Sequence, residues 1–155
     1  MTLDRLSSDI GAGEEVLLDS SALIAYFGAE PTTPVVVQLL DDWVFSGRNR
    51  AAVSAVSVME LSVWPFRVGG GAVSAVTDFL STFPNLRVLD VDMDAGLLAG
   101  KLRADVGLSP PDALIVGCAA RAGIRHLVSN DARWASRLPA LGFVVTVVDD
   151  YLPFP

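Results

Sequence analysis

Three residue types that often carry chemistry are almost missing from this chain. It has one cysteine (Cys118), one histidine (His126) and one lysine (Lys101) among 155 residues. A single cysteine cannot form an internal disulfide, and one cysteine with one histidine cannot supply the ligand cluster of a structural zinc site. We therefore exclude a disulfide scaffold and a zinc centre, and we expect a cytoplasmic protein.

Long hydrophobic runs and an excess of basic residues are missing as well. No apolar stretch approaches the ~20 residues that a membrane-spanning helix needs, so we expect no membrane partner. Residues 1–14 contain no apolar segment of the kind found in a signal peptide. The net charge is −7, which counts against broad electrostatic attraction to nucleic acid.

The composition that remains favours a well-packed globular protein. Hydrophobic residues make up 52% of the chain and charged residues only 19%. A chain of this length is one domain that buries roughly two-thirds of the surface of its unfolded form. We expect residues 1–14 to be a polar lead-in and residues 15–155 to form a single domain.

Short apolar strands alternate with longer helical patterns along the chain. Continuous runs of small and β-branched residues are typical of strands that are buried on both faces. The strands are expected over 15–18, 51–58, 85–91, 126–129 and 143–148. Because right-handed crossovers through helices make such strands parallel, the sequence predicts an α/β fold, a three-layer α/β/α sandwich around a central five-stranded parallel sheet.

Four acidic residues stand close to the points where strands and helices meet, namely Asp19, Glu60, Asp112 and Asp131. Ligands of open α/β sheets bind at the carboxyl ends of the strands. Four carboxylates gathered there would repel one another unless a cation were present. This pattern favours a divalent-metal site and metal-assisted chemistry on a phosphate ester.

Each acid also has a purely structural explanation as a helix cap. Asp19 and Asp131 are good N-cap residues, and Ser57 with Glu60 matches a capping box. Asp112 follows Ser109 by three residues, where an acid favours the positive helix end. Capping alone, however, gives no reason for four acids to gather around one cleft.

Four segments resemble, in order and spacing, the conserved blocks of PIN-domain proteins, and most closely those of VapC ribonuclease toxins. They are VLLDSSALIAYF, SAVSVMELSVWPFR, GLSPPDALIVGCAARAG and HLVSNDARW. The resemblance covers nearly all of the chain after residue 15. It implies a parallel five-stranded sheet whose first strand is central.

The resemblance also implies a function. It makes Asp19, Glu60, Asp112 and Asp131 both the catalytic residues and the ligands of Mg²⁺, or of Mn²⁺, in an endoribonuclease that cleaves RNA. It implies a cognate antitoxin protein and a homodimer. Side chains that could orient the carboxylates or contact substrate are Ser20, Ser21, Ser129, Asn130 and Arg133. Asn130 is the alternative to Asp131 at the fourth position.

Two questions stay open at this level. An acidic chain must still contact RNA phosphates, for which the candidates are Arg67, Arg103, Arg121, Arg133 and Arg137. The alternative function is a catalytically silent PIN-like module that only binds RNA or protein. Exposed apolar residues around Trp64 and Phe66 are candidates for a partner interface.

Overall fold

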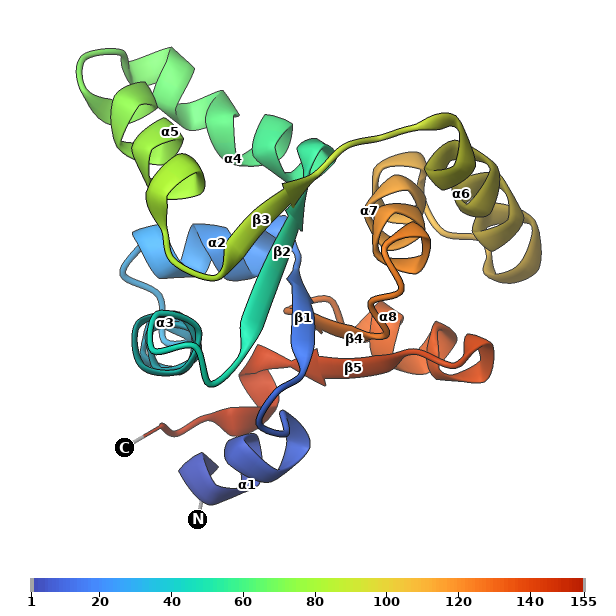
Figure 1. The fold of residues 1–155 in the computed structure, drawn as a ribbon, viewed down its shortest axis with the longest axis horizontal. Coiled ribbons are helices and arrows are strands. Elements are labelled where there is room, and N and C mark those ends of the chain that lie inside the picture. Colours follow the sequence, from blue (N-terminus) through green and yellow to red (C-terminus); the bar gives the residue numbers. More distant parts are fainter. Residues whose placement is uncertain (1, 155) are drawn as a thin grey trace.

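Five parallel strands form the centre of the structure, a computed structural model that describes residues 2–154 (Figure 1). Residues 1 and 155, the ends of the expected lead-in and domain, lie outside the described residues. The strand order is β3-β2-β1-β4-β5, with bounds β1 Glu15–Leu18, β2 Arg50–Ser54, β3 Leu86–Leu89, β4 His126–Ser129 and β5 Val144–Val147. All four strand pairs are parallel.

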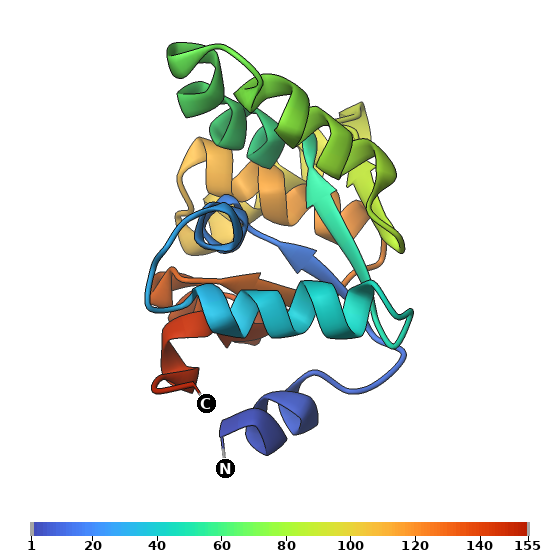
Figure 2. The same cartoon turned by 90° about the vertical axis from the view of Figure 1, so that its left-hand side faces the viewer.

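Helices cover both faces of this sheet, as Figures 1 and 2 show. One face carries α2 (Ser20–Phe27), α3 (Thr33–Val37), the π-helical η1 (Gln38–Val44), α4 (Ala55–Val68) and α5 (Ala72–Thr82). The other carries α6 (Met93–Val106), α7 (Pro110–Arg121) and α8 (Ala132–Arg137). The predicted three-layer sandwich is confirmed.

The central strand shows why the sequence takes this form. Val16 and Leu18 belong to the core cluster under α2 and α3, whereas Leu17 belongs to the cluster under α6 and α7. All three side chains are 0% exposed. Successive side chains of a strand point to opposite faces, so a strand buried on both faces needs an unbroken apolar run.

The start of α4 differs from the prediction. The strand that we expected over 51–58 ends at Ser54, and the following residues are helical. The side chain of Ser54 caps α4 by accepting a hydrogen bond from the backbone N–H of Ser57 at 3.1 Å. The predicted capping box of Ser57 with Glu60 was therefore wrong, because Ser57 already lies in the first turn of the helix.

The first residues form a helix that packs on the domain. Helix α1 (Thr2–Asp9) buries Leu6, and Ile10 follows it at 0% exposed. It lies against the end of the chain, which contains the short helical turn η3 (Val148–Tyr151). There the Tyr151 hydroxyl donates a hydrogen bond to Asp9 at 2.6 Å. The expected polar lead-in thus contributes apolar side chains to the core.

None of the helices described between residues 2 and 154 is long and apolar enough to cross a membrane.

Candidate functional site

The order of the strands changes direction at the central strand, β1. From β1 the chain moves to β2 and β3 on one side, and later to β4 and β5 on the other. This reversal of direction is the topological switch point, where open α/β sheets bind their ligands. Asp19 follows β1 directly, and residues 129–131 end β4 and lead into α8.

Asp19 is a buried carboxylate with several donors around it. It is 6% exposed and it caps α2, because its Oδ1 accepts a hydrogen bond from the Ser20 backbone N–H at 2.8 Å. Its Oδ2 accepts hydrogen bonds from the hydroxyls of Ser21 at 3.0 Å and Ser129 at 2.7 Å. Capping uses only the first of these contacts, so the cap alone does not explain the arrangement.

The electrostatics of Asp19 reflect this burial. Desolvation raises the pKa of its carboxyl above the ordinary value, hydrogen bonds from Ser129, Ser21 and Ser20 oppose that rise, and the charge of Asp112 adds to it. A buried carboxylate that also senses a second one is costly to keep ionised. Such a group favours a cation nearby.

Two serines join Asp19 to the other strand ends. The Ser129 hydroxyl, which donates to Asp19, accepts a hydrogen bond from the Asp131 backbone N–H at 3.0 Å. The Ser20 hydroxyl donates to the Glu60 carboxylate, which α4 brings in from the β2 side. The loops after β1, β2 and β4 are thus connected through short polar side chains.

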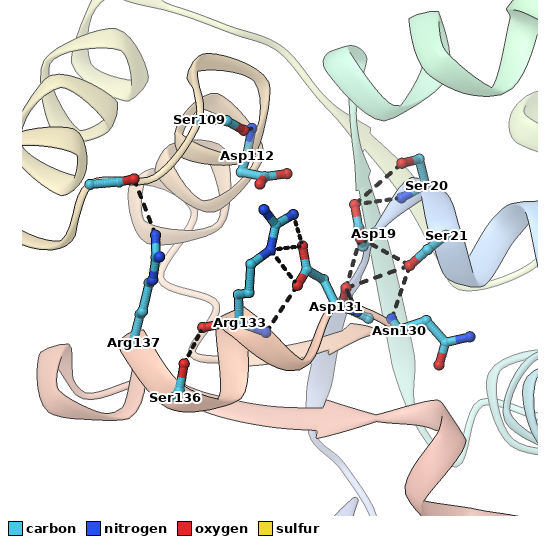
Figure 3. A network of polar contacts seen from close by, with 12 residues as sticks. Asp19, Ser20, Ser21, Ser109, Asp112, Asn130, Asp131, Arg133, Ser136 and Arg137 are labelled. Atoms are coloured by element: carbon cyan, nitrogen blue, oxygen red, sulfur yellow. Dashed lines mark hydrogen bonds and ion pairs between the residues drawn. The ribbon is translucent and has the colours of Figure 1, made fainter.

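Asp112 and Asp131 approach from the other face of the sheet. Asp112 lies in the first turn of α7, where its backbone N–H donates to the capping hydroxyl of Ser109 at 3.4 Å. Asp131 caps α8 by accepting from the Arg133 backbone N–H at 2.9 Å. The predicted cap by Asp131 is confirmed, whereas the cap of α7 is Ser109 and not Asp112. Figure 3 shows the two carboxylates facing the same space.

A cation already lies between these two carboxylates. The Arg133 side chain pairs with Asp131 through Nε and Nη2, the latter at 2.5 Å, and its guanidinium lies beside Asp112 (Figure 3). Hydrogen bonds from Arg133 lower the pKa of the Asp131 carboxyl. Within residues 2–154, no three side chains of the types His, Cys, Asp and Glu are arranged so that they could hold a metal ion.

The supporting residues divide into two groups. Ser20, Ser21 and Ser129 all contact the acids directly. Asn130 does not, because its side-chain oxygen accepts a hydrogen bond from the Asp149 backbone N–H at 3.0 Å, and it points away from Asp19 in Figure 3. Its own backbone N–H donates to Ser21 at 3.0 Å, which holds the loop in place.

The arginines proposed for phosphate contacts lie in different surroundings. Arg121 pairs with Asp92 and Asp94 at the far end of α7, about 14 Å along the helix axis from Asp112. Arg137 donates to backbone carbonyls at the end of α6. Of these three arginines, Arg133 is the one that contacts one of the four acids. The pairing of Arg133 with Asp131 could not be predicted from the sequence. A capping residue and the residue two positions after it do not have a fixed arrangement of side chains.

An apolar pocket lies on the face of the sheet that carries α2, α4 and α5, and the sequence gives only a weak indication of it. It has a volume of about 410 Å³ and lies between α2, α4 and α5, with Ile24, Phe27, Trp64 and Val76 in its lining. Trp64 is 67% exposed and the neighbouring Phe66 72% exposed. An isolated domain rarely leaves such side chains in solvent without a use for them.

Comparison with known proteins gives a family and a set of similar folds. The family model of the PIN domain matches residues 16–139. No curated protein matches the chain. Among solved structures, the fold is similar to a toxin–antitoxin complex from Klebsiella pneumoniae, with 21% identity, 85% of this chain and 97% of that chain covered, and a TM-score of 0.66.

Two further structures show the same similarity. One is VapC20 of Mycobacterium tuberculosis, described as a sarcin-ricin loop cleaving toxin, with 18% identity, coverages of 83% and 96%, and a TM-score of 0.61. The other is DNA-bound VapBC from Salmonella typhimurium, with 24% identity, coverages of 86% and 97%, and a TM-score of 0.57. At identities this low, the similarity establishes a shared fold alone.

Proposed function

Since the chain belongs to the PIN domain family, we propose that it is a metal-dependent endoribonuclease and the toxin of a VapBC-type toxin–antitoxin pair. The observation that carries this proposal is the environment of Asp19. A carboxylate 6% exposed lies at the switch point of the sheet, in the electrostatic field of Asp112 and linked through serines to Glu60 and Asp131. A structural cap needs none of these links.

The donor set fits a divalent cation of the Mg²⁺ or Mn²⁺ type. Asp19, Glu60, Asp112 and Asp131 offer only carboxylate oxygens, which are the ligands that these hard cations prefer. When bound, such an ion supplies Lewis-acid polarisation of a phosphate oxygen and activation of the attacking water. The four carboxylates would hold it, and its charge would oppose the burial and the smaller repulsion from Asp112 that raise the pKa of Asp19.

The chain's own residues act by positioning these groups. The hydroxyls of Ser21 and Ser129 orient the Asp19 carboxylate, and the Ser20 hydroxyl orients Glu60. The Asn130 backbone N–H fixes the β4–α8 loop against α2. Arg133, whose guanidinium lies between the carboxylates of Asp112 and Asp131, is the side chain that we propose for contact with an RNA phosphate, which would offset part of the net charge of −7.

The test is RNA cleavage by the purified chain without a partner, with Mg²⁺, with Mn²⁺ and with EDTA. We expect cleavage that EDTA abolishes and that Asp19→Asn lowers roughly 100-fold or more. Asp42→Asn is the matched control, because it removes the same charge from an exposed position on η1. Equal activity of the two variants would contradict the assignment of Asp19.

The alternative, a PIN-like module that binds RNA or protein without cleaving, is favoured by one observation. Asp131 is paired with Arg133, and the described residues hold no ready metal-binding cluster. A folded chain that binds neither Mn²⁺ nor Mg²⁺ and leaves total RNA intact would support this alternative over the nuclease.

The partner proposed for the apolar pocket is the antitoxin. Solved relatives of this fold are toxin–antitoxin complexes, and the pocket between α2, α4 and α5 is lined by Trp64, which lies on the same helix as Glu60. Trp64→Ala should weaken antitoxin binding at least tenfold, as expected for an aromatic anchor. It should leave cleavage by the free chain unchanged. The homodimer that the family implies is tested by sedimentation of the same samples.

A further inference from the structure

The hydrogen bonds at Asp131 use the whole carboxylate. Its Oδ1 accepts from the Arg133 backbone N–H and from Nε, both at 2.9 Å. Its Oδ2 accepts from Nε at 3.1 Å and from Nη2 at 2.5 Å. A carboxylate has about four lone-pair positions, and three N–H groups of one residue surround them here, with Nε–H shared between the two oxygens. In this conformation a metal ion that binds Asp131 must compete with the guanidinium.

The guanidinium also places a positive charge where the acids face one another. Figure 3 shows it between the carboxylates of Asp131 and Asp112. A divalent cation held by both carboxylates would meet this charge at close range, where the repulsion is strongest. The arginine and the metal ion therefore exclude each other at Asp131.

The two partners differ in how easily they move. The Arg133 side chain is 70% exposed and that of Asp131 only 22%. Exposed ion pairs contribute about fivefold or less to an equilibrium, so the arginine can leave at little cost. Asp131 stays in place, because its backbone N–H is bound to Ser129 and its carboxylate caps α8.

From these contacts we propose that Arg133 is a built-in counter-ion of the site. It stays paired with the Asp131 carboxylate until a divalent metal ion displaces it. The proposal deepens, and rests on, the metal-dependent function proposed above. Displacement leaves the guanidinium at the rim of the site, free to bind a phosphate of the RNA. Metal binding thus changes Arg133 from a ligand of the enzyme's own acid into a ligand of substrate.

The experiment measures Mn²⁺ affinity without RNA, by calorimetry and by the electron paramagnetic resonance signal of free Mn²⁺. Arg133→Gln should bind Mn²⁺ roughly two- to fivefold more tightly than the wild type, because it removes a competitor. Arg133→Lys, which keeps the charge but not the paired geometry, should fall between them. The control is Arg137→Gln, which removes the same charge from the same helix. Arg137 donates hydrogen bonds to backbone carbonyls and acts on Asp131 through its charge, without a hydrogen bond.

The coupling must run through Asp131. In an Asp131→Asn background, Arg133→Gln should change the Mn²⁺ affinity less than twofold, since the shared partner is gone. A second readout is the Arg133 Nε–H resonance in ¹⁵N NMR, identified by its loss in Arg133→Gln. It should shift on titration with Mg²⁺ as the ion pair breaks.

Each result decides between the alternatives. If Arg133→Gln binds Mn²⁺ as well as or more weakly than the wild type, or if Arg137→Gln gains equally, the inference is overturned while the metal site stands. If neither the wild type nor Arg133→Gln binds Mn²⁺, the metal site of the proposed function fails and takes the inference with it. Tight binding only after the substitution would support both.

Discussion

The hydroxyl of Ser129 donates a 2.7 Å hydrogen bond to Oδ2 of Asp19, although 110 residues separate the two in the chain. Ser129 is the last residue of β4 and Asp19 follows the last residue of β1. Pairing of these two strands brings them together, and both are buried. The contact therefore connects the sheet directly to the candidate site.

Ser129→Ala should lower the free energy of unfolding by about 1–3 kcal/mol, because a buried hydrogen bond to a charged group is lost. It should also raise the pKa of Asp19 further, since the hydrogen bond from Ser129 opposes the effect of burial. Urea unfolding measures the first and ¹³C NMR of the carboxyl the second. Ser136→Ala, which removes an exposed hydroxyl from α8, should change neither.

Stability should depend on pH through Asp19. Because burial holds its folded-state pKa above 3.8, the folded state binds the proton more tightly than the unfolded state. The stabilisation that comes from protonation of Asp19 is present below pH 3.8 and is lost as the pH rises through the folded-state pKa. Asp19→Asn mimics the neutral form, so it should gain stability relative to the wild type as the pH rises.

We expect this gain to reach about 1 kcal/mol at pH 7. Urea unfolding at pH 3, 5 and 7 measures it, with Asp42→Asn as the exposed control, whose difference from the wild type should stay flat. If the gain in the free energy of unfolding of Asp19→Asn becomes smaller toward pH 7, burial is not the main influence on the pKa of this carboxyl.

Gly117 should be intolerant of a side chain because α6 and α7 meet there. A Cβ at this position would lie 2.6 Å from the carbonyl oxygen of Ala95 and 3.1 Å from the backbone nitrogen of Ala99. Backbone atoms cannot move aside cheaply, so Gly117→Ala should destabilise the fold by about 1–3 kcal/mol and displace the helix that carries Asp112. Thermal unfolding gives the first effect and Mn²⁺ affinity the second.

Gly100→Ala is the matched control for that substitution. Gly100 lies within α6, and an added Cβ would meet nothing within 4 Å. Alanine is the better helix former, so this variant should gain up to about 1 kcal/mol. Similar losses in both variants would show that helix contact at Gly117 is not the cause.

The N-terminal helix should contribute to the stability of the domain. Leu6 is 1% exposed and belongs to the core cluster of the α2 face, so Leu6→Ala should cost about 2–4 kcal/mol. Leu3→Ala, in the same helix but 36% exposed, should cost less than about 1 kcal/mol. If the two cost the same in chemical unfolding, residues 1–14 are the separate lead-in that their polarity indicates.

The elements that the sequence predicted well are those whose sequence patterns lie within a few neighbouring residues. The buried run before Asp19 and the cap that Asp131 forms on α8 were both visible in the sequence. The end of β2 was not, because small β-branched residues continue across the strand–helix boundary. Its position depends on which serine, Ser54 or Ser57, caps α4.

The same distinction applies to the site. Residue type and position near strand ends and helix starts were enough to propose the four acids and the serines as candidates, because apolar runs and caps are local properties of the chain. The tertiary structure alone decided what each side chain contacts. It directed Asn130 toward Asp149, joined Ser20 to Glu60 and paired Arg133 with Asp131. Such contacts depend on how separate loops converge and on which rotamer satisfies buried charge, and no local pattern encodes either.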